Sequence, residues 1–241
     1  MLTGCSSKSE VKEYGVKVVA MTPHDVHSYT QGLFFHEGRM YESTGQYGES
    51  TFRQVDIESG RAGKRLDFDA KYFVEGSVGL NGRIYILTWM EKTAFVYNAE
   101  TLEFEQAWSY PREGWGLTTD GKQLIASDGS NVLYFMDENF SVNRKIYVTL
   151  HDRPVRWLNE LEWIDGRIWA NVYTTDTIVV INPKDGKVEA TVDCKGLLER
   201  KYRTRDTDVL NGIAHDKKSG RTYLTGKNWP FLFEIELFEK K

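Results

Sequence analysis

The sequence predicts an all-β protein built from a repeated unit. A phrase consisting of a glycine, a basic residue and an alternating run of apolar and polar residues occurs five times, at intervals of about 40 to 55 residues. Such alternation is typical of a half-buried strand, and the glycine marks a hairpin turn before it. The copies begin at Gly38, Gly82, Gly121, Gly166 and Gly220. Strand-like segments lie on both sides of each copy, and a four-stranded unit at this interval is the signature of a propeller blade, so we predict a five-bladed β-propeller.

The strands of each unit can be placed in chain order. The first strand lies upstream of the repeated phrase, and the five first strands begin at Gln31, Glu75, Trp115, Asn159 and Asn211. A third strand follows the phrase, and the linking segments at residues 63–68, 104–110, 144–150 and 188–193 supply a fourth. The longest connection contains residues 197–202, which can form a short helical turn.

The last unit is one strand short. The apolar run at residues 16–21 precedes the first unit and has no partner of its own. We expect this N-terminal strand to complete the last blade and close the ring, because closure covers two strand edges that would otherwise invite pairing with other chains.

Composition favours a single globular domain. The chain has 241 residues, of which 40% are hydrophobic and 27% charged, and this is an ordinary globular balance. The net charge is -4, and no stripe of Lys and Arg could follow a phosphate backbone. Nucleic acid is therefore not expected as a partner.

The N-terminus resembles part of an export signal. Leu2, Thr3, Gly4 and Cys5 match a bacterial lipobox, in which the cysteine is lipidated after cleavage. We therefore assign residues 1–13 to a partial lipoprotein signal peptide and tether, and residues 14–241 to the propeller domain. The protein is expected to be exported in a bacterium and lipid-anchored at Cys5, in the periplasm or at the cell surface. No apolar run is long enough to span a bilayer.

The repeats predict where the chemistry lies. In a propeller the first strands line a central channel, so the residues that begin them converge at one mouth. Here these residues are one carboxyl group, three amides and an indole. The position seven after each repeat glycine holds Gly45, Trp89, Asp128, Tyr173 and Lys227. Of these we expect Trp89 and Lys227 near the same mouth, together with Trp169 from the fourth unit. A ring made only for packing would be apolar, so these residues predict a pocket at the axis, with Trp115 in its wall.

Metal chemistry is not indicated. The five histidines form no HExxH pair, and there is no CxxC motif, so no metal site is expected. No nucleophile elbow or phosphate-binding loop is present either.

Several motifs in order resemble one family. They are YTQGL at Tyr29, YESTGQYGES at Tyr41, LTWME at Leu87, EGWGLTTDG at Glu113, LNELEW at Leu158, VLNGIAHD at Val209 and TGKNWP at Thr225. Together they resemble the plant-type and bacterial glutaminyl-peptide cyclotransferases. The resemblance implies a five-bladed propeller that converts N-terminal glutamine of peptides or proteins to pyroglutamate and releases ammonia, without a cofactor.

The resemblance also implies roles for individual residues. The catalytic glutamate falls on Glu75. The substrate-binding residues fall on Gln31, Trp89, Trp115, Asn159, Trp169 and Lys227, and Tyr29 stands where the family usually has a phenylalanine. The expected partners are glutaminyl peptides, and the protein is expected to be a monomer; a structural calcium in the channel is left open.

Two other functions are compatible with the repeats. A propeller that binds peptide termini without reaction needs the same pocket but no proton shuttle. A metal-dependent hydrolase of lactones or similar esters needs several carboxylates facing the channel, for which Glu75 and Glu160 are the candidates, with Asn159 and Asn211 as weak oxygen ligands.

Overall fold

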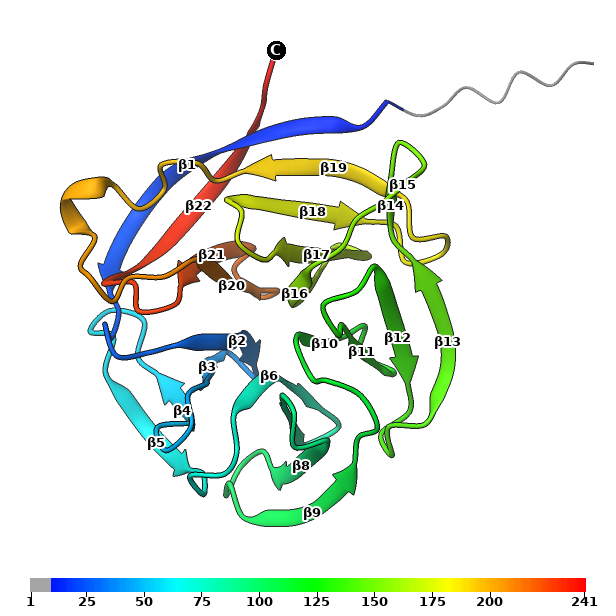
Figure 1. Cartoon of the computed structure of the whole chain (residues 1–241). Helices are drawn as coiled ribbons and strands as arrows, with labels where there is room; N and C mark the ends of the chain where they lie inside the picture. Colours follow the sequence, from blue (N-terminus) through cyan, green and yellow to red (C-terminus); the bar gives the residue numbers. More distant parts are fainter. Residues whose placement is uncertain (1–9) are drawn as a thin grey trace, which may run out of the picture.

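The computed structural model describes residues 10–241, and these residues form an almost purely β structure (Figure 1). The first sheet contains β2 (Thr30–His36), β3 (Arg39–Thr44), β4 (Thr51–Val55) and β5 (Ala62–Asp67). The second contains β6 (Val74–Leu80), β7 (Arg83–Thr88), β8 (Thr93–Asn98) and β9 (Phe104–Ser109). The third contains β10 (Leu117–Thr119), β11 (Leu124–Ala126), β12 (Val132–Met136) and β13 (Val142–Tyr147).

The largest sheet has eight strands. Its order is β16-β17-β18-β19-β1-β22-β21-β20. These strands are β16 (Leu158–Ile164), β17 (Arg167–Val172), β18 (Thr177–Ile181), β19 (Val188–Asp193), β1 (Lys12–Pro23), β22 (Phe231–Glu239), β21 (Arg221–Gly226) and β20 (Leu210–Asp216). A short hairpin of β14 (Thr149–Leu150) and β15 (Arg153–Pro154) precedes β16. Within the described residues the only helix is η1 (Arg200–Tyr202), which lies inside the segment predicted to form a helical turn.

The sheets surround a common centre. Figure 1 shows β2, β6, β10, β16 and β20 around the middle of the molecule, with β5, β9, β13 and β19 at the periphery. Each hydrophobic cluster combines residues of two sheets or half-sheets that are neighbours in this ring. One cluster, for example, joins Tyr41 and Phe52 of the first sheet to Ile84 and Ile86 of the second. The core is therefore a set of interfaces between sheets, as expected when each sheet buries a face against the next.

The turns follow from local chemistry. Asn81 and Gly82 both have positive φ values, of 50° and 73°, between β6 and β7. Asp165 and Gly166 repeat this arrangement between β16 and β17, at 48° and 76°. Two positive values in a two-residue loop match the twist of a β-hairpin, and Asn, Asp and Gly are the residues that tolerate them. The repeated glycine thus marks a hairpin turn, as predicted.

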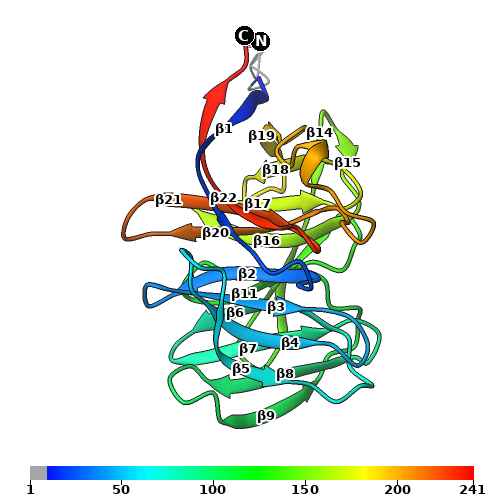
Figure 2. The same ribbon diagram turned by 90° about the vertical axis from the view of Figure 1, so that its left-hand side faces the viewer.

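The N-terminal strand connects the two ends of the described chain. β1 pairs antiparallel with β22, from Tyr14 opposite Glu239 to Pro23 opposite Phe231. Figure 2 shows the two strands running side by side. β1 also pairs in parallel with β19, from Lys12 to Gly15, and this contact was not predicted. The strand begins at Lys12, so the last two residues assigned to the tether belong to it.

Candidate active site

A pocket of about 340 Å³ opens where the innermost strands begin. Its lining residues come from segments far apart in the sequence. They are Tyr29, Gln31, Gln46, Phe73, Glu75, Trp89, Trp115, Trp157, Asn159, Tyr173 and Lys227. Seven of the eight side chains predicted for the site, all except Trp169, are in this set.

A β-bulge lies at the start of four innermost strands. The strand register shifts between Thr30 and Gly32 in β2, Val74 and Ser77 in β6, Leu158 and Leu161 in β16, and Leu210 and Ile213 in β20. Gln31, Glu75, Asn159 and Asn211 all lie within these shifts. A bulge changes the direction in which a side chain points, so it separates these polar residues from the alternation of the rest of the strand.

Glu75 is buried in the pocket. Its side chain belongs to a residue only 5% exposed, and its Oε1 accepts a hydrogen bond of 3.0 Å from Gln31 Nε2. Its Oε2 has no hydrogen-bond partner within residues 10–241. Burial raises the pKa of Glu75 well above its ordinary value, Lys227 opposes the rise, and the charges of Glu91 and Glu113 add to it. Burial therefore favours the protonated form of this carboxyl more than in an exposed glutamate, and one of its two oxygens is left without a partner.

An amide of the neighbouring strand orients Gln31. Asn211 Nδ2 donates to Gln31 Oε1 at 3.2 Å and to the Thr30 carbonyl at 2.9 Å. With its oxygen occupied in this way, Gln31 presents its NH₂ group to Glu75. Asn211 does not line the pocket, and its contribution is to fix the direction of the Gln31 amide.

Lys227 is a buried residue in the wall of the same pocket. It is 3% exposed, and its ammonium group lies 4.5 Å from the centre of the Tyr29 ring and 5.2 Å from that of Tyr173. Burial lowers the pKa of Lys227, while Glu75 and Asp208 oppose the change. The hydroxyl of Tyr29 donates to Asp208 at 2.8 Å, which fixes the ring beneath the ammonium group. Lys227 is thus a buried amino group in the wall of the pocket, close to two tyrosine rings.

One carboxylate fixes two indoles of the wall. Glu113 Oε2 accepts hydrogen bonds from Trp89 Nε1 at 2.9 Å and from Trp115 Nε1 at 3.1 Å. The backbone beside Trp115 is equally constrained, because Gly76 N donates to the Trp115 carbonyl at 2.7 Å. A Cβ atom at Gly76 would lie 2.5 Å from that carbonyl oxygen. The glycine after Glu75 therefore permits the close approach of the strands that bear the two residues.

Asn159 has an unpaired acceptor. Its backbone carbonyl accepts from Ser127 Oγ at 2.8 Å, but its side-chain Oδ1 has no partner within the described residues. A buried unpaired oxygen is costly in a folded protein. In a pocket it is a position where a substrate N–H can donate.

Comparisons with known proteins identify the family. The family model described as glutamine cyclotransferase matches residues 2–237. The chain belongs to the glutamine cyclotransferase family. It is 41% identical over 229 residues to a curated glutaminyl-peptide cyclotransferase of Arabidopsis thaliana, a match that covers 92% of this chain and 71% of the relative. The crystal structure of Myxococcus xanthus glutaminyl cyclase is similar with a TM-score of 0.89 and 33% identity, over 96% of this chain and 100% of that one.

A more distant likeness concerns the fold alone. The WD40 β-propeller domain of Doa1 matches 85% of this chain, and 62% of its own length, with a TM-score of 0.51 and 10% identity. Together with the ring of small sheets, this likeness shows that the cyclotransferase-family chain has a propeller-like all-β fold. The family resemblance found in the sequence is confirmed.

Trp169 was predicted to line the pocket, but in this family member it does not. Trp169 packs in a hydrophobic cluster with Ile164, Ile178 and Val180. The pocket lies at the end of β16 and β17 where Leu158 opposes Val172, whereas Trp169 is opposite Glu162. Three residues along a strand amount to about 10 Å, so the side chain lies deeper in the molecule than the pocket. Tyr173, just after β17, is at the mouth instead.

Sequence reasoning missed several other lining residues. Gln46, Phe73 and Trp157 lie in connections between strands, where the repeats are not alike. Gln46 and Trp157 are unusual in the structure, where their φ values are positive, at 98° and 65°. The sequence gives no sign of these backbone conformations. Trp115 itself precedes β10, which begins two residues later than predicted.

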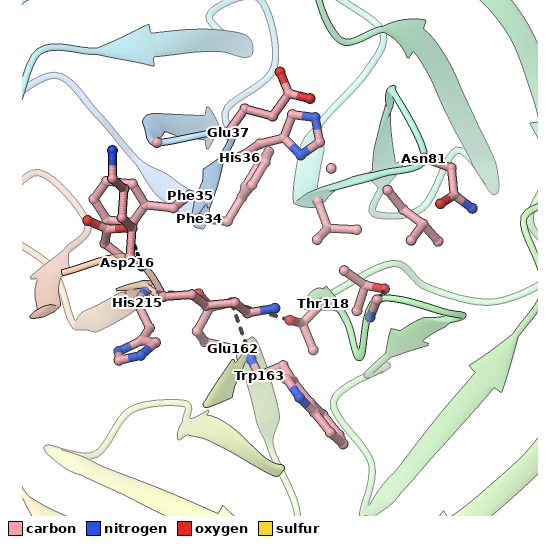
Figure 3. Close-up of a pocket in the computed structure, with 18 residues that line it drawn as sticks. Phe34, Phe35, His36, Glu37, Asn81, Thr118, Glu162, Trp163, His215 and Asp216 are labelled. Atoms are coloured by element: carbon pink, nitrogen blue, oxygen red, sulfur yellow. Dashed lines mark hydrogen bonds between the residues drawn. The ribbon is translucent and has the colours of Figure 1, made fainter. Parts of the chain in front are cut away.

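A second cavity opens where the innermost strands end. It has a volume of about 530 Å³, and Glu162, Thr118, His36 and His215 are among its lining residues (Figure 3). Glu162 accepts hydrogen bonds from His215 N at 2.9 Å and from Thr118 Oγ1 at 3.3 Å, so both of its oxygens are engaged. The cavity is larger than the first, but its central carboxyl is already satisfied by the protein.

The carboxylates that a metal-dependent hydrolase would need are not grouped in the described part of the chain. Within residues 10–241 no three His, Cys, Asp or Glu side chains are grouped so that they could bind a metal.

Glu160 accepts backbone hydrogen bonds from Leu33 N at 3.2 Å and Ile213 N at 2.9 Å, which links three innermost strands. No helix among residues 10–241 is long and apolar enough to cross a membrane.

Proposed function

We propose that this protein is a glutaminyl-peptide cyclotransferase, which converts the N-terminal glutamine of a peptide or protein to pyroglutamate and releases ammonia. The observation that carries the proposal is the buried carboxyl of Glu75, which keeps one unpaired oxygen inside a pocket walled by indoles. Membership of the family and the identity to the Arabidopsis enzyme support the same reaction.

In the proposed mechanism Glu75 moves a single proton. The α-amino nitrogen of the substrate attacks its own side-chain carboxamide carbon, and the new C–N bond closes the five-membered ring. Glu75 accepts the proton that the attacking nitrogen loses and transfers it to the departing NH₂ group, which leaves as ammonia when the second C–N bond breaks. One group can serve as base and then acid when its pKa lies near the working pH, and burial raises the pKa of Glu75 in that direction.

The other pocket residues are proposed to hold the substrate. The attack is intramolecular, so much of the acceleration comes from holding the flexible glutamine side chain in a curled conformation. The unpaired Oδ1 of Asn159 accepts from a substrate N–H, and Trp89 and Trp115 shape the wall. Negative charge develops on the carboxamide oxygen during attack, and either Lys227 or the Gln31 amide stabilises it.

We infer a five-bladed propeller. The eight-stranded sheet divides into β16–β19 and the group of β20, β21, β22 and β1, which gives five four-stranded units with the three separate sheets. The pairing of β1 with β22 supports closure of the ring by the N-terminal strand.

The expectations for the N-terminus remain proposals. We propose that Cys5 is lipidated and anchors an exported, monomeric enzyme at the periplasmic or outer surface of a bacterium. The lipobox at residues 2–5 supports this, and Cys5 lies outside the described residues. The enzyme is proposed to need no cofactor.

The test is ammonia release from Gln-Gln after treatment with a chelator. We expect turnover by the natural chain and a loss of about two orders of magnitude or more in Glu75→Gln, the scale of one acid/base group. Glu162→Gln is the matched control, because it changes a buried carboxyl at the other cavity. Release lost only to the chelator would favour the hydrolase-type metal site, and no release from folded protein would favour a peptide-binding propeller.

A further inference from the structure

Trp157 is an exposed indole at the mouth of the pocket. It is 55% exposed, although burial of such a large apolar side chain would be favourable. The centre of its ring lies 6.1 Å from that of Trp115, and the two ring planes are inclined by 38°. The two indoles therefore form one aromatic surface that extends from the pocket to its mouth. No requirement of the core explains the size of this side chain.

The backbone of Trp157 is strained and firmly held. Its φ value of 65° is in the left-handed region, which bulky residues seldom adopt and which costs on the order of 1 kcal/mol or more. Trp157 N donates to the Gly129 carbonyl at 2.8 Å, and Tyr173 N donates to the Trp157 carbonyl at 2.8 Å. The connections that contain Gly129 and Tyr173 therefore hold the backbone of Trp157 in this conformation. The position of its ring at the mouth of the pocket is fixed accordingly.

The order of residues along the pocket defines what Trp157 can contact. Glu75 is buried at the inner end, Trp115 is intermediate in exposure, and Trp157 is exposed. A substrate whose glutamine reaches Glu75 must leave the pocket through its peptide bond, so its second residue lies at the mouth. Another part of the rim is aromatic as well, because the ring centre of the exposed Tyr47 lies 5.4 Å from that of Phe73, which lines the pocket.

We propose that Trp157 forms a subsite for the side chain of the second residue of the substrate and favours an apolar or aromatic side chain there. This inference rests on the proposed cyclotransferase function. An exposed aromatic face gains little from a glycine and most from a side chain that covers it. The contact is made equally in the bound and the reacting substrate, so it acts on KM and leaves kcat nearly unchanged.

The experiment compares Gln-Phe-amide with Gln-Gly-amide. For the natural chain we expect a higher kcat/KM with Gln-Phe-amide. In Trp157→Gly this preference falls by roughly three- to tenfold, the size of one aromatic contact, through KM alone. Trp157→Phe retains most of the preference, and Trp163→Ala, which removes an indole at the other cavity, retains all of it.

The glycine variant separates binding from structure. Glycine adopts a positive φ readily, so Trp157→Gly is expected to melt at or above the temperature of the natural chain. A lowered melting temperature with equal losses on both substrates would overturn the proposal, as would an unchanged substrate preference. If the natural chain turned over neither substrate, the proposed function itself would fail, because Gln-Gly-amide does not depend on the subsite.

Discussion

At the scale of single residues, the site depends on side chains that act through others. Glu113 does not line the pocket, yet its carboxylate holds Trp89 and Trp115 together and adds to the raised pKa of Glu75. Asn211 acts in the same way on Gln31. These residues set the position and the electrostatics of the groups that meet the substrate.

Glu113→Gln tests this role. The amide oxygen can still accept an indole N–H, but the negative charge is lost, so the charged form of Glu75 becomes less unfavourable and its pKa falls. We expect the limb of the pH profile of kcat/KM that reports Glu75 to move to lower pH. Glu103→Gln, an exposed glutamate in another connection, should leave the profile unchanged. An unshifted limb in Glu113→Gln would mean that its charge does not act on Glu75.

Repeats in the sequence made part of the site predictable. Gln31, Glu75 and Asn159 each lie seven residues before a repeated glycine, and Lys227 lies seven residues after one. The glycine therefore fixes where the strands that carry them start and end. Trp169 was placed wrongly because the repeat gives the strand but not which of its positions reaches the mouth. Trp157 and Phe73 could not be found, since the connections that carry them follow no repeat and are positioned only by contacts between sheets.

At the scale of elements, β16 contributes residues to both cavities and also hydrogen-bonds to neighbouring central strands. Asn159 lines the first cavity, Glu160 bonds to the backbones of β2 and β20, and Glu162 lines the second cavity. The hydrophobic alternation of a strand does not predict two buried glutamates. The reason becomes visible only in the structure, where backbone N–H groups of neighbouring strands need acceptors.

The pKa of Glu162 predicts how stability depends on pH. Burial raises this pKa to about 8, so the folded protein retains a proton that the unfolded chain loses near pH 4.5. Stability from this group is therefore fully present below about pH 4.5 and is lost as the pH rises toward 8. Glu162→Gln should flatten this decline, and its melting temperature should exceed that of the natural chain at pH 8 more than at pH 5. Parallel melting curves at both values would show that Glu162 does not titrate in this range.

At the scale of the whole molecule, closure of the ring depends on one strand. β1 contacts the last strand of the described chain along its length and a second half-sheet through Lys12–Gly15. The sequence predicted the first contact from an unpartnered apolar run. The parallel contact with β19 was not predictable, because it depends on how far β1 extends beyond the ring.

Deletion of residues 12–23 tests the closure. It exposes an edge of β22 and opens the ring, so we expect loss of a single cooperative thermal transition and of near-ultraviolet circular dichroism. Lys12→Ala is the control, because it removes an exposed 3.4 Å ion pair with Glu239 but leaves the backbone pairing of β1 in place, so the melting temperature should hardly change. A deletion variant that melted in one transition near the natural temperature would show that the ring is stable without β1.

The position of β1 has a consequence for synthesis. β1 is made before every other described strand, and β22, its partner, is the last strand of the described chain. At roughly 5 to 20 residues per second, β1 waits on the order of 10 to 45 s before β22 exists. The pocket waits too, because Gln31 comes from the first innermost strand and Lys227 from the connection before β22. Chains that lack Lys227 and β22 therefore cannot assemble the site, and the nascent protein stays inactive until both have been synthesised.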